Sequence, residues 1–339
     1  MPAGAGYLPS VSLDEYLSHA AAEHPGLHDL IDPTRAWSPR LLSALVSVTN
    51  EFDSDETGRG DSYRRAQRDA SVRWTGARQL LQLATPADSP GDVTLLDVLG
   101  GDGTIARAVA DRADSRLAKL SIITGDISGE MVARALAQGL PAVRQSADAL
   151  LLRDASINAT LLAYGTHHIA PADRPQAASE AVRVVKPGGR VVLHDFDTAS
   201  PMARFFTEVV HPYSAAGHDY AHFSRAELTA LFSGLPVTAV VLDVYDPLIV
   251  EADDRETACA RMCQYIADMY GVQEVFSAHR DTAASWAFVE EIFDHSCYAA
   301  ELRDAPPGVP LRPVLRESGG RWFAEVPRMA IVAVAEKRA

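Results

Sequence analysis

One short segment constrains the fold of this chain more than any other. Residues 93–99 form an almost continuous apolar run, which predicts a strand buried on both faces of a sheet. Gly100, Gly101 and Gly103 follow directly, and a helical pattern begins at Thr104. Glycines at such a turn let the chain bend sharply and let a ligand approach the backbone closely. The amide groups at the start of the following helix suit a carboxylate or a phosphate.

The same order of elements repeats after this turn. Strands that alternate with helices form βαβ units, whose right-handed crossovers build a doubly wound, mainly parallel sheet. The pattern predicts further strands at residues 120–124, 158–163, 190–193, 237–244 and 326–335, and helices at 104–113, 128–139 and 174–185. We therefore expect an α/β fold whose ligand lies at the carboxyl ends of the strands.

Two further regions have helical patterns. Before the sheet, the sequence predicts helices at about residues 13–24, 39–48 and 61–83. It also predicts a turn-rich loop at residues 53–58 and a linker at residues 85–92. Near the C-terminus, residues 251–270 and 285–298 also look helical. These two helices form an insert at about residues 251–305, just before the last strand, where they are placed to cap a site.

The composition argues against several classes of function. The chain has 339 residues, and its 31 basic and 45 acidic side chains give a net charge of −14. Nucleic-acid binding needs clustered basic residues, so no nucleic-acid partner is expected. No uncharged apolar run approaches about 18 residues, which argues against a membrane span. Three cysteines make no disulfide framework, and residues 1–14 lack a secretory signal, so we expect a cytoplasmic protein.

The glycine turn resembles a known motif. Asp97, Gly101 and Gly103 match motif I of class I S-adenosylmethionine-dependent methyltransferases, which reads acid-x-Gly-x-Gly-x-Gly. Leu99 stands where that family has its first glycine. Asp126 ends the second strand, where a carboxylate accepts the ribose hydroxyls of an adenosine ligand. Gly103 and Ala106 leave a dinucleotide-binding turn as the alternative reading.

The resemblance continues along about residues 72–200. Residues 146–148 resemble the segment whose acid contacts adenine, residues 163–168 resemble the strand end beside the methyl group, and residues 184–190 resemble the turn before the fifth strand. The resemblance implies a Rossmann-like sheet of seven strands with S-adenosylmethionine as cofactor. It implies a cofactor site formed by Asp97, Leu99, Gly100, Gly101, Gly103, Thr104, Asp126, Ile127, Ala147, Asp148 and Tyr164.

Histidines gather in one part of the sequence. Six of the eleven fall between residues 167 and 222. If the acceptor must lose a proton, histidine is the usual base near neutral pH. We expect catalytic roles for His168, His194, His218 and His222, and substrate contacts from His167, Asp195 and Tyr220. A structural role stays open for each of them. We expect no metal, although His211, His218 and His222 form an alternative ligand set because imidazole binds iron and zinc.

The resemblance leads to a functional hypothesis. Residues 91–339 would be the cofactor-binding catalytic domain, and residues 1–90 a helical cap or dimerisation region of a homodimer. The expected reaction is methyl transfer to a small molecule, an amino-acid-derived or 2-oxo-acid compound of bacterial secondary metabolism. Two alternatives stay open: a cyclisation or rearrangement without methyl transfer on the same scaffold, and a regulator that binds a ligand without catalysis.

Overall fold

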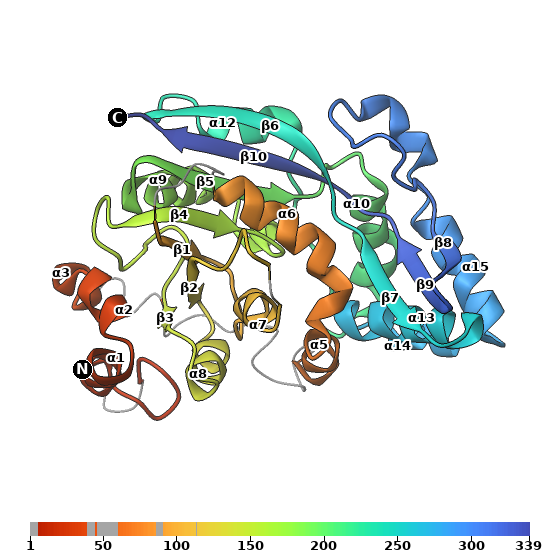
Figure 1. The fold of residues 1–339 in the computed structure, drawn as a ribbon, viewed down its shortest axis with the longest axis horizontal. Coiled ribbons are helices and arrows are strands. Elements are labelled where there is room, and N and C mark those ends of the chain that lie inside the picture. The colour runs from red at the N-terminus through yellow and green to blue at the C-terminus, as the bar shows by residue number, and fades with distance from the viewer. Residues whose placement is uncertain (1–5, 39–44, 46–59, 86–90, 113) are drawn as a thin grey trace.

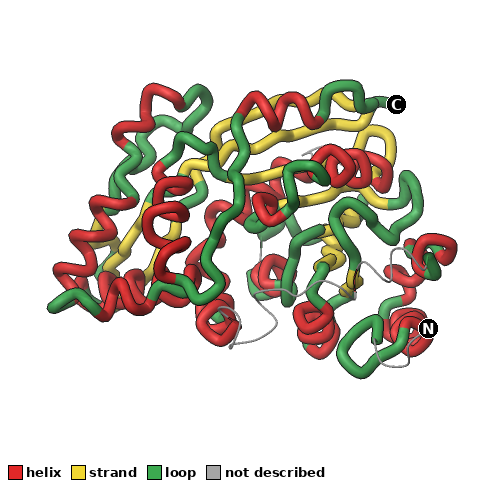
Figure 2. Tube along the Cα trace, turned by 180° about the vertical axis from the view of Figure 1, so that it is seen from behind, coloured by secondary structure: helices red, strands yellow, loops and turns green. Residues whose placement is uncertain are grey.

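The fold is built around one large sheet with helices on both faces. A computed structural model describes residues 6–38, 45, 60–85, 91–112 and 114–339. Figure 1 shows the seven-stranded sheet, with a smaller three-stranded sheet and a group of helices beside it. Figure 2 shows the helices that cover the opposite face.

The strand order confirms the predicted doubly wound sheet. The order is β3-β2-β1-β4-β5-β10-β6, and only β10 runs antiparallel to its two neighbours. The direction of winding reverses between β1 and β4, and such a switch point opens a crevice at the carboxyl ends of the strands. The strands are β1 (Val93–Asp97), β2 (Leu120–Asp126), β3 (Ala142–Arg144), β4 (Ile157–Leu162), β5 (Val185–Asp195), β6 (Val237–Tyr245) and β10 (Met329–Lys337).

Neighbouring residues of the central strands belong to two separate hydrophobic cores, one on each face of the sheet. Leu95 and Leu161 belong to the core on one face, whereas Leu96 and Leu162 belong to the core on the other. All four are fully buried, as expected for a parallel sheet covered on both sides. The helices that connect the strands are α7 (Thr104–Ala110), α8 (Gly129–Ala137), α9 (Arg174–Val184) and α12 (Arg225–Leu231).

The N-terminal region is helical where it is described. The first helix begins with a capping box, in which Ser12 and Glu15 exchange hydrogen bonds. The elements are α1 (Leu13–Glu23), α2 (Pro25–Leu30), α3 (Pro33–Ala36), α5 (Gly60–Gln67), a 3₁₀ turn (Ala70–Arg73) and α6 (Trp74–Ala84). Three predicted elements lie outside the described residues wholly or in large part: the loop at 53–58, most of the linker at 85–92 and the helix at 39–48. Of that helix only Leu45 is described, and it is helical.

The single helix predicted over residues 61–83 is wrong, because the chain breaks there. The Asp69 carboxylate accepts a hydrogen bond from the backbone amide of Ser71 and so starts a new helical turn. Beyond this break, α6 packs against β4 and β5 and contributes Leu80 and Leu81 to the core of the large sheet. The division of the chain at residue 90 stays a prediction.

The insert predicted at about residues 251–305 is helical over most of its length, but strands that the sequence did not predict flank it. These strands, β7 (Leu248–Ala252), β8 (Val314–Ser318) and β9 (Arg321–Val326), form a separate sheet in the order β7-β9-β8. Residues 251 and 252 therefore belong to a strand rather than to a helix. Gly319 and Gly320 both have positive φ and close the hairpin between β8 and β9.

The helices of the insert pack on one face of the small sheet. The longest is α13 (Arg255–Tyr270), followed by α14 (Gln273–Ser277) and α15 (Thr282–Ile292). Figure 1 places them next to α5 and α10 (Pro201–Phe205), at the same end of the molecule as the small sheet. Within the described part of the chain, no helix has both the length and the apolar character needed to cross a membrane.

Candidate functional site

The glycine turn between β1 and α7 depends on glycine for two physical reasons. Gly101 and Gly103 have φ values of +58° and +85°, in the left-handed region that side chains rarely adopt. A Cβ atom on Gly103 would lie 2.3 Å from the Leu140 side chain, which packs over the turn. Among the described residues, nothing lies within 4 Å of a Cβ atom placed on Gly101, so none of them fills the space beside this glycine.

Asp126 joins the end of β2 to this turn. One carboxylate oxygen accepts a hydrogen bond from the Gly101 amide at 2.9 Å, and the other accepts from the Ser128 amide at 2.8 Å. The Gly100 amide also donates to the Gly125 carbonyl oxygen at 2.8 Å. The predicted ribose acid therefore lies against the glycine turn, at the carboxyl edge of neighbouring parallel strands.

Asp97 is a buried acid at the base of the crevice. Its side chain is 2% exposed, and its Oδ1 atom has no hydrogen-bond partner among the described residues. Burial and the neighbouring Asp126 carboxylate raise the pKa of Asp97 to about 7, against a lowering effect of Arg73. A cationic donor bound in the crevice would satisfy this oxygen and stabilise the charged carboxylate.

The segment predicted to contact adenine lies beside Asp126. It follows β3, and the Gln145 amide donates to the backbone oxygen of Asp126 at 2.9 Å. Ser146 donates a side-chain hydrogen bond to Asp148, which fixes the short turn that contains Ala147. The remaining predicted cofactor residues lie at the same carboxyl edge. Leu99 is in the turn after β1, Thr104 begins α7, and Ile127 directly follows β2.

Tyr164 has an unusual backbone conformation where the chain leaves β4. Its φ is +60°, which costs free energy for a residue with a side chain and persists only where the surroundings hold it. Its hydroxyl group donates to Asp246 at 3.1 Å, and Asp246 also accepts from the buried Arg328 at 2.7 Å. The ring lies 4.8 Å from the ring of His194.

Arg73 is a site residue that sequence reasoning missed. Its side chain is buried, and its guanidinium group lies 4.9 Å from the centre of the Tyr164 ring and donates to Gln67. Its positive charge also lowers the pKa of the Asp97 carboxyl group. No pattern singles out Arg73, because it lies in a segment that reads as an ordinary polar helix.

Asp195 organises the opposite side of the crevice, at the end of β5. Its Oδ2 atom accepts from the Thr166 hydroxyl and from His167 Nδ1 at 3.0 Å. Its Oδ1 atom accepts from the Phe196 amide at 2.7 Å and from His222 Nδ1 at 2.8 Å. Burial alone would raise the pKa of Asp195, but His167 and His222 hold it well below the usual value.

The structure brings most of the predicted histidines together around this acid. The ring of His167 lies 4.6 Å from His168, 5.0 Å from His218 and 4.6 Å from His222, measured between ring centres. Tyr220 lies 4.2 Å from His168. The end of β4 and the loop before α12 supply these side chains, so residues about 50 positions apart in sequence meet at one edge of the sheet.

Two histidines behave differently from the rest. His194 is 1% exposed, packs between Tyr164 and Phe196, and points an imidazole nitrogen at Asp246, 3.4 Å away. It is therefore separate from the other predicted catalytic residues. His211 accepts a hydrogen bond from the His218 amide and so fixes the loop; it does not join the ligand set that the sequence left open.

A π-helix borders the histidines. Residues 206–210 form this rare turn between α10 and α11 (His211–Tyr213), and such turns are frequent at functional sites. Phe206 stacks on His218, with ring centres 4.3 Å apart and planes 21° apart, and also contacts His222. The π-helix thus places one aromatic side chain against two of the predicted catalytic histidines.

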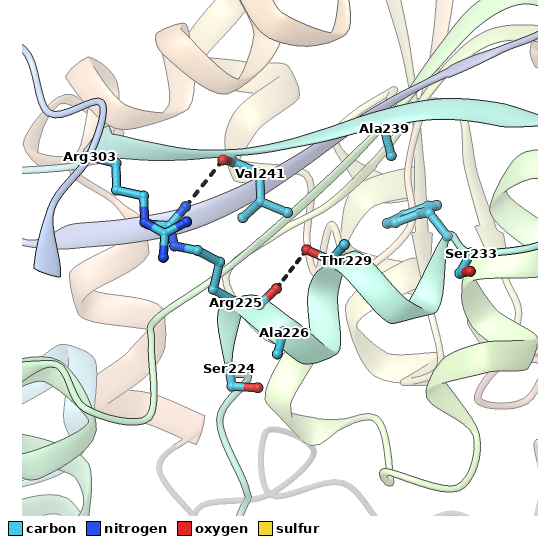
Figure 3. A pocket seen from close by; sticks show the side chains of 9 residues that line it. Ser224, Arg225, Ala226, Thr229, Ser233, Ala239, Val241 and Arg303 are labelled. Atoms are coloured by element: carbon cyan, nitrogen blue, oxygen red, sulfur yellow. Dashed lines mark hydrogen bonds between the residues drawn. The ribbon is translucent and has the colours of Figure 1, made fainter.

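A separate hollow of about 810 Å³ lies at the outer edge of the sheet, between β6 and α12. Figure 3 shows Arg225 reaching the carbonyl oxygen of Val241 across it, with Arg303 nearby. Arg225 also pairs with the buried Asp243, which fastens α12 to β6. No predicted site residue lines this hollow, so it is separate from the crevice at the carboxyl ends of the strands.

Comparison with known proteins agrees with this geometry. Residues 96–193 match a family model described as a methyltransferase domain. The ubiquinone/menaquinone biosynthesis C-methyltransferase UbiE of Brucella anthropi is 32% identical over 157 residues, which are 44% of this chain and 54% of that protein. The same enzyme of Brucella suis is 36% identical over 157 residues, 44% of this chain and 53% of that protein. The chain thus spans about half the length of the curated relatives it matches.

A solved structure has a similar fold. It is a chain from the complex between the Haloferax volcanii Trm112 methyltransferase activator and its candidate methyltransferase, with 16% identity and a TM-score of 0.50. The match covers 86% of this chain and all of that one. The matched methyltransferase domain runs from β1 to β5 and contains the glycine turn, Asp126 and the adenine segment. Its match, the sequence relatives and the seven-stranded sheet show that residues 96–193 form a methyltransferase domain of the class I type that uses S-adenosylmethionine as cofactor.

Proposed function

We propose that this protein transfers the methyl group of S-adenosylmethionine to a small-molecule acceptor. The observation that carries the proposal is the open glycine turn, tied to Asp126, beside a buried cluster of imidazole side chains at the switch point of the sheet. Methyl transfer is a displacement that needs the acceptor held in line with the methyl group. The crevice provides one wall for the cofactor and another for the acceptor.

The cofactor wall has a group for each part of the cofactor. The Asp126 carboxylate, which can accept about four hydrogen bonds, would hold the ribose hydroxyls as well as the two backbone amides. Asp148 would receive the adenine amine. The buried carboxyl of Asp97 suits the cationic amino group, and the buried guanidinium of Arg73 suits the carboxylate of the cofactor.

The acceptor wall is formed by His167, His168, His218 and Tyr220. The cofactor supplies a methyl group on a positively charged sulfur atom, so the acceptor atom must supply an electron pair. Where that atom carries a proton, His168 is the first candidate to remove it, because it is only half-buried at the end of β4. His222 and Asp195 would hold the other imidazoles in place.

We infer that the acceptor is an amino-acid-derived or 2-oxo-acid compound of bacterial secondary metabolism. The support is the chemistry of the wall: imidazole and phenol groups donate hydrogen bonds to carboxylate and carbonyl oxygens. The C-methyltransferase names of the curated relatives make a carbon atom next to a carbonyl group the first acceptor to test.

We further propose that residues 1–90 act as a cap and dimerisation region in a cytoplasmic homodimer. The contacts of this region support a fixed position, since the Tyr16 hydroxyl donates to the Ala142 carbonyl oxygen of β3. Trp37 at the end of α3 is 47% exposed, which is unusual for a large aromatic side chain and suits an interface. Light scattering on the full chain and on a Trp37→Glu variant measures the oligomeric state directly.

The activity is tested with cofactor that carries a labelled methyl group. The full-length protein is incubated with a panel of 2-oxo acids and amino acids, and products are separated from the cofactor. We expect label in one acceptor class and formation of S-adenosylhomocysteine. Conversion of an acceptor without incorporation of label would show a reaction other than methyl transfer and contradict the proposal.

The role of His168 is tested by His168→Ala with His279→Ala as the control, because His279 lies in the insert against Ser285. We expect the first variant to lose turnover by about 100-fold, the scale of acid–base catalysis, with cofactor affinity unchanged. The control should match the parent protein. A change confined to cofactor affinity would make His168 a binding residue.

A further inference from the structure

The histidines on the acceptor wall have a property that methyl transfer does not require. One nitrogen each from His167, His168 and His218 lies within 4.8 Å of the corresponding atoms of the other two. His167 and His218 are buried, and His168 is half-buried. We call these three side chains the histidine triad. Three imidazole donors that converge in this way are a common ligand set for a transition-metal ion.

The hydrogen bond from His167 to Asp195 prepares the ring for such an ion. Asp195 accepts a hydrogen bond from Nδ1 of His167 at 3.0 Å, which places the proton of that ring on Nδ1. The lone pair is then on Nε2, at the other side of the ring. A carboxylate that orients a ligating histidine in this way is the usual arrangement behind metal sites.

A second group of three, His167, Asp195 and His222, also brings potential ligand atoms within 4.8 Å. Here, however, each carboxylate oxygen of Asp195 already accepts two hydrogen bonds: from Thr166 and His167 on one, and from Phe196 and His222 on the other. A carboxylate surrounded by four donors is occupied as a hydrogen-bond acceptor. Asp195 therefore positions the imidazoles, and the histidine triad is the better ligand set.

The spacing of the triad fits a single ion. The ring centres of its members are 4.6, 5.0 and 5.4 Å apart. Three imidazoles that bind one zinc ion tetrahedrally, with bonds of about 2.1 Å, have ring centres about 5 Å apart. The rings thus need only small rotations to converge, and the stacking of Phe206 on His218 restricts one of them in advance.

We propose that the histidine triad binds one divalent first-row transition-metal ion, such as Zn²⁺ or Fe²⁺, on the acceptor side of the crevice. Three protein ligands leave a coordination position open, as in catalytic rather than structural sites. Tyr220 lies next to one member of the triad, with its ring centre 4.2 Å from that of His168. With an ion bound, His168 would hold the ion and would not remove a proton. The open position would take an oxygen atom of the acceptor, and this last step rests on the proposed function, whereas metal binding does not.

Metal binding is tested on the full-length protein after treatment with a chelator and dialysis. Zn²⁺ is titrated calorimetrically, and Co²⁺ is titrated by its visible absorption, which reports the coordination geometry. We expect one ion per chain. His168→Ala and His218→Ala should each weaken binding by about 100-fold or more, Asp195→Asn by about 10- to 100-fold, and the control His279→Ala not at all.

Two further measurements keep the result unambiguous. Because His218→Ala removes the ring that stacks on Phe206, His218→Gln is measured beside it, and circular dichroism confirms that each variant is folded. The Asp126→Ala variant should bind Zn²⁺ like the parent while losing affinity for S-adenosylmethionine, and the triad variants should show the reverse. Absence of stoichiometric binding, or equal Zn²⁺ affinity in parent and folded triad variants, would overturn the metal site and leave the proposed methyl transfer standing.

Discussion

The two walls of the crevice are built in different ways. The cofactor wall uses backbone: a glycine turn with positive φ angles, amides tied to Asp126, and a helix that begins at Thr104. The acceptor wall uses side chains: imidazoles from two distant segments that share the Asp195 carboxylate. Apart from Arg73, the cofactor wall lies within about 50 residues of sequence, whereas the acceptor wall draws on residues 164–222 and is assembled only by the fold.

This difference has a physical consequence for substitutions. A backbone wall keeps its shape when one exposed side chain changes, so a substitution there should alter ligand binding more than stability. A side-chain wall depends on a few buried hydrogen bonds, and loss of a shared acceptor leaves several donors unsatisfied. Cofactor-wall variants should therefore stay stable and lose affinity, and the central acceptor-wall variant should lose stability.

The largest effect is expected for Gly101→Val. A branched side chain at this φ is strained and would fill the open space that the turn leaves for the cofactor. We expect the affinity for S-adenosylmethionine, measured by calorimetry, to fall by more than about 100-fold. Gly139→Val is the matched control, because Gly139 also has positive φ and open surroundings but lies beyond α8. Equal affinity losses in both variants would attribute the effect to strain alone.

The next effect concerns the acceptor wall, where Asp195→Ala removes the acceptor of four buried donors. We expect the free energy of unfolding in urea to fall by about 3–5 kcal/mol at pH 7, the scale for breaking a buried charge pair. Asp195→Asn keeps the shape and should lose less. A stable alanine variant would mean that this wall does not depend on its central acid.

The pH dependence of that loss has a definite sign. The pKa of Asp195 is lower in the folded than in the unfolded protein, so its contribution is fully present above the unfolded value of about 4. The contribution disappears as the pH falls through the lower folded value. The stability difference between parent and alanine variant should therefore shrink in strong acid, as the pH falls through the folded pKa of Asp195.

The same contrast explains what could be predicted from sequence. The turn at Gly100–Gly103, the strands around it and the Ser128 cap of α8 follow from local pattern, and the structure confirms the sheet. The histidines could be named as candidates because they gather in one segment. Their arrangement could not, because it depends on which strand ends are neighbours, and so the separation of His194 from the rest was missed.

Other features escaped because their signal is weak or comes from distant contacts. The strand β3 has only three residues, and β7 pairs with β9 across about 70 residues of sequence. The Gly319-Gly320 pair was a usable signal for the β8–β9 hairpin. Arg73 had none, since only its burial against Tyr164 distinguishes it from the exposed arginines around it.

Asp126→Ala is expected to have a smaller effect than the first two changes. It removes the hydrogen bonds of one charged group to the ribose, which contribute about 1.5–3 kcal/mol and correspond to about 10- to 100-fold in cofactor affinity. Asp111→Ala, at the exposed end of α7, serves as the control. A loss of stability larger than the loss of binding energy would contradict the contrast between the two walls.

The buried acid of the cofactor wall predicts a pH effect of about tenfold. Asp97 has a pKa of about 7 in the folded protein, so raising the pH from 6 to 8 charges it and should tighten binding of the cationic cofactor. Stability should change in the opposite sense, since the folded protein holds a proton that the unfolded chain loses near pH 4. Asp97→Asn should abolish both dependences, and a persistent pH effect on affinity would point to another group.

The smallest effect is expected at the residue that touches both walls. Tyr164→Phe removes one hydrogen bond to Asp246 but leaves the bond from Arg328 and the contact of the ring with His194. We expect a loss of about 1 kcal/mol in the free energy of unfolding and a change in cofactor affinity below about threefold. The reason is that the hydroxyl group bonds to Asp246, which keeps its hydrogen bond from Arg328 in the variant. A loss of cofactor affinity as large as that of Asp126→Ala would show that the hydroxyl group belongs to the binding surface. The division into a backbone wall and a side-chain wall would then fail at the residue where the two walls meet.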